Sequence, residues 1–353
     1  MPGRPTMTDV ARRAGVSRAL VSIVFRDVPG ASEQTRVRVR AAAAELGYQP
    51  DRRARLLSRR RTRVLGVTFA LGHVFHADLL VGLYRAAGEH DQELALSGTT
   101  PGRDETEAVA DLLALRCDAV LLLGSGLGDA ALADLAATVP TVVVARATAA
   151  PRVDVVRTDD VAGEALAARH LVDLGHTHLV HVDGGSAAGA DERRLGFRTA
   201  VEAAGLVPAP PERGGLTEDA GAAAAERLLA RPHRPTGIAV FNDQSAAGLM
   251  DVLQQAGLRW PEDLSVVGYD DSPLARTRWA HLTTVRQDVD ALARLAVQRA
   301  VERVEDPDGA GREDLVAPSL VVRSSTGPPR GDGPGPALRS PGTPGAGPRG
   351  GGR

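Results

Sequence analysis

The sequence predicts an α/β protein with a small helical module at the amino terminus and a large body of doubly wound parallel sheets. Apolar residues recur at helical spacing in three short stretches between residues 6 and 46. From Val64 onward, continuous apolar runs of strand length alternate with amphipathic helical stretches, which is typical of parallel sheets covered by helices on both faces. The first 63 residues are strongly basic, whereas the rest of the chain is acidic.

The first two helices are marked by local capping signals. Thr6 with Asp9 three residues later is a capping-box-like start, in which each side chain can satisfy the free backbone N–H at the other position. Gly15 supplies a left-handed turn that ends the first helix, and Ser17 can cap a second helix over residues 18–25. Two short helices joined by a Gly-containing turn of this length form a helix-turn-helix.

A third helix is expected from Ser32 to just before Gly47. The three helices share one apolar face, made by Val10, Ala11, Ala14, Val16, Leu20, Val21, Val24, Val39, Ala42, Ala43 and Leu46. A helical bundle of this kind binds either protein or nucleic acid, so the periodicity alone leaves both alternatives open.

Charge favours nucleic acid. Residues 1–63 contain 15 arginines and five acidic residues, a net charge of +10; because the whole chain is −2, the remainder is −12. A basic module on an acidic body is the electrostatic pattern expected for a polyphosphate partner. The chain has no lysine, so its all-arginine usage reflects composition and says little about function.

Two segments of this region resemble a known family. TDVARRAGVSRALVS and ELGYQPDRRARLL are similar to the headpiece and hinge of the LacI/GalR family of transcriptional regulators, and the similarity continues to about Ser324. The resemblance implies that the second helix enters the major groove of operator DNA. It implies headpiece contacts with DNA from Thr6, Met7, Ser17, Arg18, Ala19, Ser22, Ile23, Arg26 and Thr35.

The resemblance also divides these contacts by role. Bases face Arg18, Ala19 and Ser22, and phosphates are held by Thr6, Ser17 and Thr35. The guanidinium of Arg18 can bond both acceptors of a guanine edge, worth about 1 to 3 kcal/mol of discrimination. The sequence departs from the family at Ile23 and Arg26, where VSRVLN is commoner than VSIVFR. Ile23 either touches a thymine methyl or packs, so the operator sequence is not predicted.

Residues 50–58 resemble the hinge helix of the family, which folds on the operator and inserts a leucine into the minor groove. Leu57 occupies that position, and Ala54 is a further expected DNA contact. Apolar wedges of this kind kink DNA at a cost of a few kcal/mol. The alternative is that Leu56 and Leu57 are ordinary contacts under a linker; the surrounding arginines favour the wedge.

The body contains repeated strand–helix units. Expected strands begin at or near Val64, Leu94, Ala119, Thr141, Leu179, Ile238 and Val266. Such sheets bind ligands at the carboxyl ends of their strands.

Cys117 is the single cysteine, so no intrachain disulfide is possible and a reducing compartment fits. The first residues lack the apolar region of a secretory signal, and no apolar run is long enough to span a bilayer, so a cytoplasmic protein is expected.

The resemblance implies four parts in the chain. Residues 1–49 form the helix-turn-helix domain, 50–63 the hinge helix and linker, and 64–326 a periplasmic-binding-protein-like effector and dimerisation domain. Its two subdomains cover about 64–158 plus 289–316 and 159–285 plus 317–326, with a sugar or sugar derivative between them. Residues 327–353 are rich in Gly, Pro and Arg and are expected to be disordered. They lack the leucine heptads of tetrameric relatives, so a homodimer is expected.

Five effector-binding residues follow from motifs shared with the family, namely Phe75, Arg193, Asn242, Asp270 and Gln287. Arg193 and Asp270 could bind vicinal hydroxyls as a donor and acceptor pair in a closing cleft. The alternative for each is a structural hydrogen bond at the seam between subdomains. Two departures leave the effector unidentified: Ala145 stands where many relatives have an acid, and LGHVFHADLL replaces ISNPFFAELL, which brings in His73 and His76.

Other arrangements of polar residues are weaker. The glycines after the strand at 119–123 do not follow GxGxxG spacing, and Asp129 would oppose a phosphate, so a tight turn is favoured over a nucleotide loop. His176, His178 and His181 lack a third ligand on the same face for a metal. A glycosidase would need one acid with a raised pKa and a fixed separation between carboxylates; neither is visible in the sequence for the pairs at 159–160 and 270–271, and no GxSxG elbow occurs.

The sequence therefore predicts a DNA-binding transcriptional regulator, expected to repress, whose operator binding is controlled by a small-molecule effector. No enzyme activity, cofactor, metal or membrane contact is expected. A periplasmic sugar-binding protein would share the body, but the basic headpiece and the missing signal argue against it. An enzyme on a doubly wound scaffold remains an alternative that would need an assembled nucleophile or base. Whether the effector induces or corepresses is not predicted.

Overall fold

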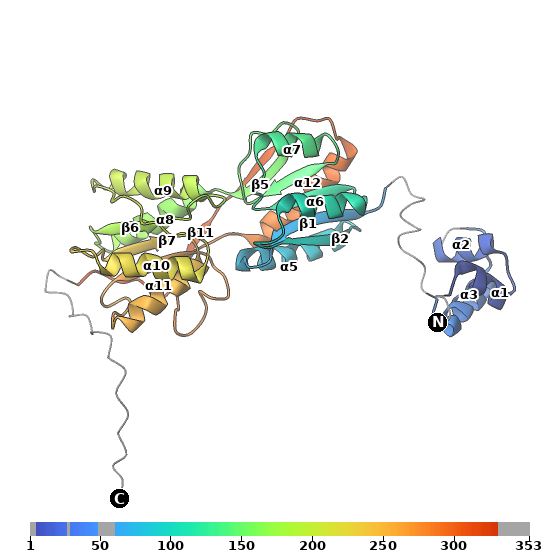
Figure 1. The fold of residues 1–353 in the computed structure, drawn as a ribbon, viewed down its shortest axis with the longest axis horizontal. Coiled ribbons are helices and arrows are strands. Elements are labelled where there is room, and N and C mark those ends of the chain that lie inside the picture. The colour runs from blue at the N-terminus through green and yellow to red at the C-terminus, as the bar shows by residue number, and fades with distance from the viewer. Residues whose placement is uncertain (1–4, 27–28, 49–60, 331–353) are drawn as a thin grey trace, which may run out of the picture. The chain divides into compact units, whose positions relative to one another are not determined.

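A computed structural model of the protein describes residues 5–26, 29–48 and 61–330 (Figure 1). The chain divides into two compact units, Met1–Thr62 and Arg63–Arg353. The expected minor-groove contacts Ala54 and Leu57, and the tail from residue 331 onward, lie outside the described residues.

In its described residues, the first unit forms the helices α1 Met7–Ala14, α2 Arg18–Arg26 and α3 Glu33–Leu46. The predicted capping box is confirmed, because Asp9 N donates to Thr6 Oγ1 over 3.3 Å and Thr6 N donates to Asp9 Oδ2 over 2.9 Å. Gly15 and Gly47 end α1 and α3 with φ of 63°, a left-handed conformation that glycine adopts without strain.

The three helices of the first unit share a small core in which Val10, Val21 and Val39 are fully buried. Phe25 and Tyr48 close one side of it, with ring centroids 5.7 Å apart. Leu20 is an exception to the predicted face, because it is only half-buried and does not belong to the core. One residue step turns a helix by about 100°, so the residue before an inward-facing Val21 lies at the flank.

The second unit begins with a parallel sheet in the order β10-β5-β4-β3-β1-β2. Its strands are β1 Val64–Ala70, β2 Glu93–Thr99, β3 Ala119–Leu123, β4 Thr141–Val144, β5 Asp154–Thr158 and β10 Glu313–Val316. Its helices are α5 Val74–Glu89, α6 Glu105–Ala114, α7 Asp129–Ala136 and α12 Val289–Glu305. Helices α5 and α12 pack together on one face, where the main core of this sheet lies.

The other sheet of this unit has the order β11-β9-β8-β7-β6, parallel except for β11, which pairs antiparallel with β9. Its strands are β6 Leu179–Val182, β7 Gly237–Val240, β8 Ser265–Asp270, β9 Thr283–Arg286 and β11 Ser319–Val321. Its helices are α8 Asp160–Asp173, α9 Ala190–Ala203, α10 Glu218–Leu229 and α11 Asp243–Gln255. Helices α8 and α9 cover one face, and α10 and α11 the other (Figure 1).

The chain crosses between the two sheets after β5, after β9 and after β10. Continuous apolar strands sandwiched between helices confirm the predicted doubly wound architecture. None of the described helices is both long and apolar enough to cross a membrane.

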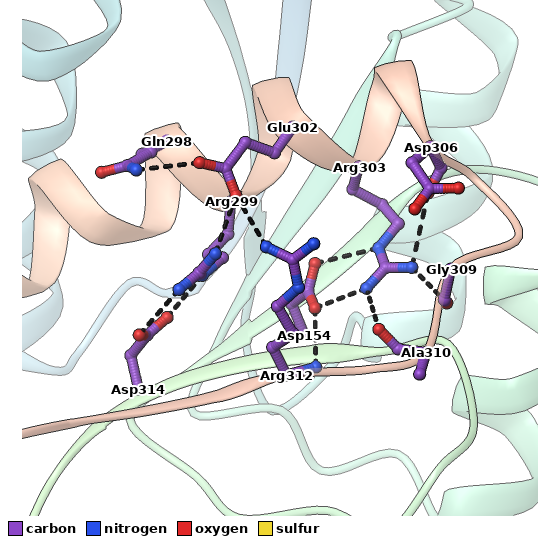
Figure 2. Close-up of polar contacts among 10 residues, drawn as sticks. All are labelled: Asp154, Gln298, Arg299, Glu302, Arg303, Asp306, Gly309, Ala310, Arg312 and Asp314. Atoms are coloured by element: carbon purple, nitrogen blue, oxygen red, sulfur yellow. Dashed lines mark hydrogen bonds and ion pairs between the residues drawn. The ribbon is translucent and has the colours of Figure 1, made fainter.

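A buried arginine on α12 joins the strands at the outer edge of the first sheet (Figure 2). Arg303 donates to both carboxylate oxygens of Asp154, over 2.9 and 2.6 Å, and to the backbone oxygens of Asp306, Gly309 and Ala310. These bonds use all five N–H donors of the guanidinium. The return segment from α12 to β10 is thereby tied to the start of β5.

Candidate functional site

A cavity of about 450 Å³ lies between the two sheets of the second unit, at the carboxyl ends of their strands. One wall comes from the loops after β1, β3 and β4, and the other from α9 and the ends of β7 and β8. All five predicted effector residues line it: Phe75, Arg193, Asn242, Asp270 and Gln287. Parallel sheets bind ligands at this edge, so the cavity is the candidate ligand site.

Two residues that line this cavity have strained backbone. Ala145, directly after β4, has φ 63°, and Asp270, at the end of β8, has φ 112°. Such conformations are costly for residues with a Cβ and persist where the surrounding structure enforces them, often at functional sites. Ala145 brings only a methyl group to its lining position.

Arg193 on α9 is the most constrained side chain of the cavity. Its Nε donates to Asp160 Oδ1 over 2.9 Å, and Nη1 donates to the backbone oxygen of Phe241 over 2.5 Å. The ring of Tyr269 lies 3.5 Å from the guanidinium carbon and that of Phe241 lies 4.4 Å away. In the described part of the chain, Nη2 has no hydrogen-bond acceptor. The rings and Asp160 fix the plane of the guanidinium while leaving donors for a ligand.

Asp270 and Gln287 form a second polar group on the same cavity. Gln287 Nε2 donates to Asp270 Oδ1 over 2.7 Å, and Gln287 Oε1 accepts from Thr158 Oγ1 over 2.7 Å. Burial raises the pKa of Asp270, the neighbouring Asp243 carboxyl adds to the rise, and the charge of Arg193 opposes it. Gln287 therefore orients Asp270 and links it to β5 of the other sheet, a contact across the seam between the subdomains.

Asn242 lines the cavity but is also structural. Its Oδ1 accepts from Ser245 N over 2.8 Å and caps α11, while Nδ2 donates to the backbone oxygen of Leu216 over 3.1 Å. Asn242 therefore makes structural hydrogen bonds, which were the alternative to a role in ligand binding. One Nδ2 hydrogen and one lone pair of Oδ1 remain for a ligand.

The opposite wall carries three rings from the start of α5. Phe75 is 3% exposed, and His73 and His76 stack with centroids 4.3 Å apart and planes 9° from parallel. Both histidines line the cavity with Phe75. The sequence identified the two histidines only as departures from the family pattern. Their burial depends on tertiary packing, which the sequence does not show.

The loop after β3 is held from both sides. Glu105 Oε2 accepts from Ser125 Oγ over 3.0 Å and from Gly126 N over 2.8 Å, while Arg146 Nη1 donates to the backbone oxygens of Ser125 and Leu127. A carboxylate already occupies the Gly126 N–H that a phosphate would need. This loop is a braced turn, as favoured by the sequence, and its bracing residues were not predicted because 20 residues separate Glu105 from Ser125.

The three histidines that were considered as metal ligands lie in different environments. His176 is buried and bonded to Thr236 Oγ1 over 2.9 Å and Ser265 Oγ over 3.0 Å, whereas His178 is exposed. His181 Nδ1 lies 3.0 Å from Glu164 Oε1 in a buried pair. Across the described residues, no three His, Cys, Asp or Glu side chains gather closely enough to hold a metal ion.

On the first unit, Thr6 and the positions from Ser17 to Ala19 lie at the amino ends of α1 and α2, whereas Ser22 and Ile23 lie further along α2. Ser17, Arg18 and Ala19 are exposed at the start of α2, and Ser17 Oγ accepts from Leu20 N over 3.1 Å. Backbone N–H groups at helix amino ends favour phosphate oxygens. The side chain of Arg26 lies outside the described residues.

The other predicted positions of this unit are partly engaged in the fold. The Thr6 hydroxyl donates to Asp9 Oδ2 over 2.6 Å, and Thr35 Oγ1 lies 2.9 Å from Ser32 Oγ. Met7 is half-buried and packs against the core. Half-buried Ile23 lies close to Gly30, where an added Cβ would meet its side chain at 3.5 Å, but it does not belong to the core of this unit.

A helix-turn-helix unit joined to a body with a ligand-sized cleft defines a DNA-binding regulator that responds to a small molecule. Two family models match the chain: "Bacterial regulatory proteins, lacI family" over residues 6–51 and "Periplasmic binding protein-like domain" over residues 168–326. The ribose operon repressor of Escherichia coli strain K12 is 33% identical over 327 residues, covering 91% of this chain and 99% of that protein. The chain therefore belongs to the LacI family of bacterial regulatory proteins.

Solved structures give the same assignment. A LacI transcriptional regulator from a Rhodococcus species is 42% identical with a TM-score of 0.71, covering 75% of this chain and 98% of that chain. The lac repressor dimer bound to operator and the anti-inducer ONPF is 28% identical with a TM-score of 0.81, covering 92% of this chain and all of the other. These relatives are repressors or regulators, and the predicted family and fold are confirmed.

Proposed function

We propose that this protein is a transcriptional repressor that binds a palindromic operator as a homodimer and releases or gains the operator when a small molecule occupies the cleft. One observation carries the proposal: a basic helix-turn-helix with an exposed Arg18 precedes a unit whose cavity is lined from both sheets. A ligand between two sheets favours one relative arrangement of them over another. Because operator DNA is in the cytoplasm, we place the protein there.

We assign the parts of the chain as the sequence suggested. Residues 1–49 read DNA, 50–63 form the hinge and linker, 64–326 bind effector and dimerise, and 327–353 form a tail. In this proposal the base edges face Arg18, Ala19 and Ser22, the phosphates are held by Thr6, Ser17 and Thr35, and the minor groove receives Leu57. Further DNA contacts without an assigned role are Met7, Ile23, Arg26 and Ala54. The similarity to a dimeric, operator-bound repressor supports these roles.

The effector proposed for the cleft is a sugar or sugar derivative. The free donors of Arg193 and the acceptor oxygens of Asp270 face one cavity, and such a pair suits two adjacent hydroxyls. Phe75 supplies an apolar ring face, and Gln287 and Asn242 supply further polar atoms. The effector can change operator affinity only by its difference in affinity for the two states, typically about 1 to 3 kcal/mol.

The DNA-binding part of the proposal is tested with double-stranded oligonucleotides selected from a random library by the full chain. A two-fold symmetric consensus is expected, since a dimer presents two headpieces. Arg18→Ala should weaken binding to the selected site by about 1 to 3 kcal/mol while changing binding to unrelated DNA much less. Arg38→Ala, which removes an exposed arginine from α3, is the matched control for lost charge. Equal losses on selected and unrelated DNA for Arg18→Ala would contradict base readout.

A further inference from the structure

We propose that the cleft selects an uncharged, hydroxyl-rich effector over phosphorylated or carboxylated analogues, and that His73 and His76 are specificity-determining residues for this choice. The inference rests on the effector role proposed above for the same cavity. It adds the chemical class of ligand and names two side chains that the family motifs did not supply.

The tautomer of His76 is fixed by the backbone. Its Nδ1 accepts a hydrogen bond from Ala70 N over 3.0 Å, so the neutral ring carries its proton on Nε2. Nε2 points at Gly124, where an added Cβ would lie only 3.0 Å away. Gly124 lines the cavity, and its missing side chain leaves room beside this N–H. His76 therefore offers a neutral hydrogen-bond donor on the cavity wall.

His73 offers a polar atom that the protein leaves unsatisfied. Its Nδ1 is buried, and no partner for it exists among the described residues. Leaving a buried polar atom unpaired costs about 1 to 3 kcal/mol, and a turn of the ring that brings Nδ1 to the cavity would let a ligand atom recover it. A hydroxyl suits this position because it donates to an unprotonated nitrogen and accepts from a protonated one. The ring stack with His76 and the edge contact with Phe75, at 6.4 Å, hold His73 in place.

Both imidazoles stay uncharged at neutral pH. Burial, with a contribution from the charge of Arg193, lowers the pKa of His73 to about 4. Burial and the neighbouring His73 lower the pKa of His76 to about 3. The two rings therefore act as neutral hydrogen-bonding groups and supply no positive charge for an anionic ligand.

The remaining charges of the cavity also disfavour an anion. Two arginines line the cavity: Asp160 offsets the charge of Arg193, whereas Arg146 donates through Nη1 to two backbone oxygens and keeps its charge. Three carboxyl side chains line the same cavity: Asp191, Glu192 and Asp270. A phosphate placed there would lose its water and would meet more carboxyl groups than arginines. Uncharged hydroxyls avoid that cost and match the donors and acceptors present.

The experiment compares matched ligand pairs on the full chain by thermal shift and calorimetry. The probes are ribose and ribose 5-phosphate, glucose and glucose 6-phosphate, galactose and galactose 6-phosphate, and the polyols ribitol and sorbitol. At least one uncharged probe should bind, and its phosphorylated partner should bind at least tenfold more weakly. A phosphorylated probe that binds as tightly as its parent sugar would overturn the proposal, and so would failure of every uncharged probe to bind.

Variants then test the two histidines with the uncharged probe that binds. His73→Phe and His76→Phe keep a ring but remove the polar nitrogens, so each should weaken binding several-fold to about tenfold. His73→Arg adds a cation to the wall and should shift the preference toward the phosphorylated partner at least tenfold. His178→Phe, at an exposed histidine that does not line the cavity, is the matched control.

If the three cavity variants all kept the sugar affinity and the preference over the phosphorylated partner, the two histidines would not determine specificity and the proposal would be wrong. Operator binding, measured on the same protein by fluorescence anisotropy, separates the two proposals. A protein that binds its selected DNA but no uncharged probe contradicts this inference alone. A protein that binds sugar but has no sequence preference on DNA contradicts the proposed function.

Discussion

Arg193 and Arg303 are both arginines on helices of the second unit, and both are almost fully buried, at 5% and 4% exposed. Their surroundings differ. Arg303 gives all five donors to protein acceptors: two to the carboxylate oxygens of Asp154 and three to backbone oxygens of the short stretch 306–310 (Figure 2). Arg193 has two protein acceptors, Asp160 and the backbone of Phe241, and lies against two aromatic rings beside a cavity.

The difference separates a structural arginine from one kept for a ligand. A saturated guanidinium cannot bind anything else, so Arg303 contributes to the fold by joining α12, β5 and the segment before β10. An unsaturated guanidinium fixed by rings and one carboxylate is pre-organised, and its free donors gain partners only when a ligand arrives. The exposed fraction alone does not distinguish Arg193 from Arg303.

The largest effect is expected for Arg303→Met. The substitution keeps much of the side-chain volume but leaves the carboxylate of Asp154 buried without its cation, which costs about 3 to 5 kcal/mol. The free energy of unfolding is measured by urea denaturation of the full chain. Arg312→Met, at a largely exposed arginine of the same cluster, should cost less than about 1 kcal/mol. Similar losses in the two variants would mean that saturation of Arg303 contributes little.

Arg193→Met should destabilise the protein less than Arg303→Met but abolish ligand-induced stabilisation. Burial already raises the pKa of its partner Asp160, so that carboxyl can take up a proton when the arginine is lost. The same urea titration, repeated with the sugar that binds, measures both effects. A sugar that still raises the free energy of unfolding of Arg193→Met would move the ligand away from this residue.

A smaller effect concerns the histidines that face Arg193. Their folded pKa values, about 4 for His73 and about 3 for His76, lie below the ordinary value of 6.5. The unfolded chain therefore binds more protons between those values, so stability is full above pH 6.5 and is lost as the pH falls. At pH 5 each histidine costs about 2 kcal/mol by this linkage.

The double variant His73→Asn/His76→Phe tests this sign. Its loss of unfolding free energy between pH 7 and pH 5 should be smaller than that of the unmodified protein by about 2 to 4 kcal/mol. The other histidines are the same in both proteins, and His178→Asn controls for removing an exposed one. Equal losses in the double variant and the unmodified protein would mean that the two rings titrate freely.

Local signals made much of the fold predictable. The caps at Thr6 and Gly15 depend on neighbouring residues, and the apolar runs of β3 and β4 stand out in the sequence. The strands β5, β9, β10 and β11 were not singled out, because polar residues interrupt their apolar pattern. The crossings between sheets are contacts between distant segments, and only the family resemblance implied them.

The candidate site shows the same limit. Arg193 and Asp270 were reached through motifs, and the structure brings them to one cavity. The partners that distinguish Arg193 from Arg303 were not predictable, since Asp154 lies 149 residues from Arg303 and Asp160 lies 33 residues from Arg193. The neutral state of His73 and His76 depends on burial, which spacing along the chain does not reveal.

The central claim is that occupancy of the cleft controls operator binding, and one titration tests it most directly. Operator affinity of the full chain is measured by fluorescence anisotropy with and without the sugar that binds, for the unmodified protein and for Arg193→Ala. The account predicts a change of about 5- to 150-fold for the unmodified protein. For Arg193→Ala it predicts the same sugar-free operator affinity and no change on adding sugar. The account would be contradicted if sugar did not change the operator affinity of the unmodified protein, or if sugar changed that of Arg193→Ala by as much as that of the unmodified protein.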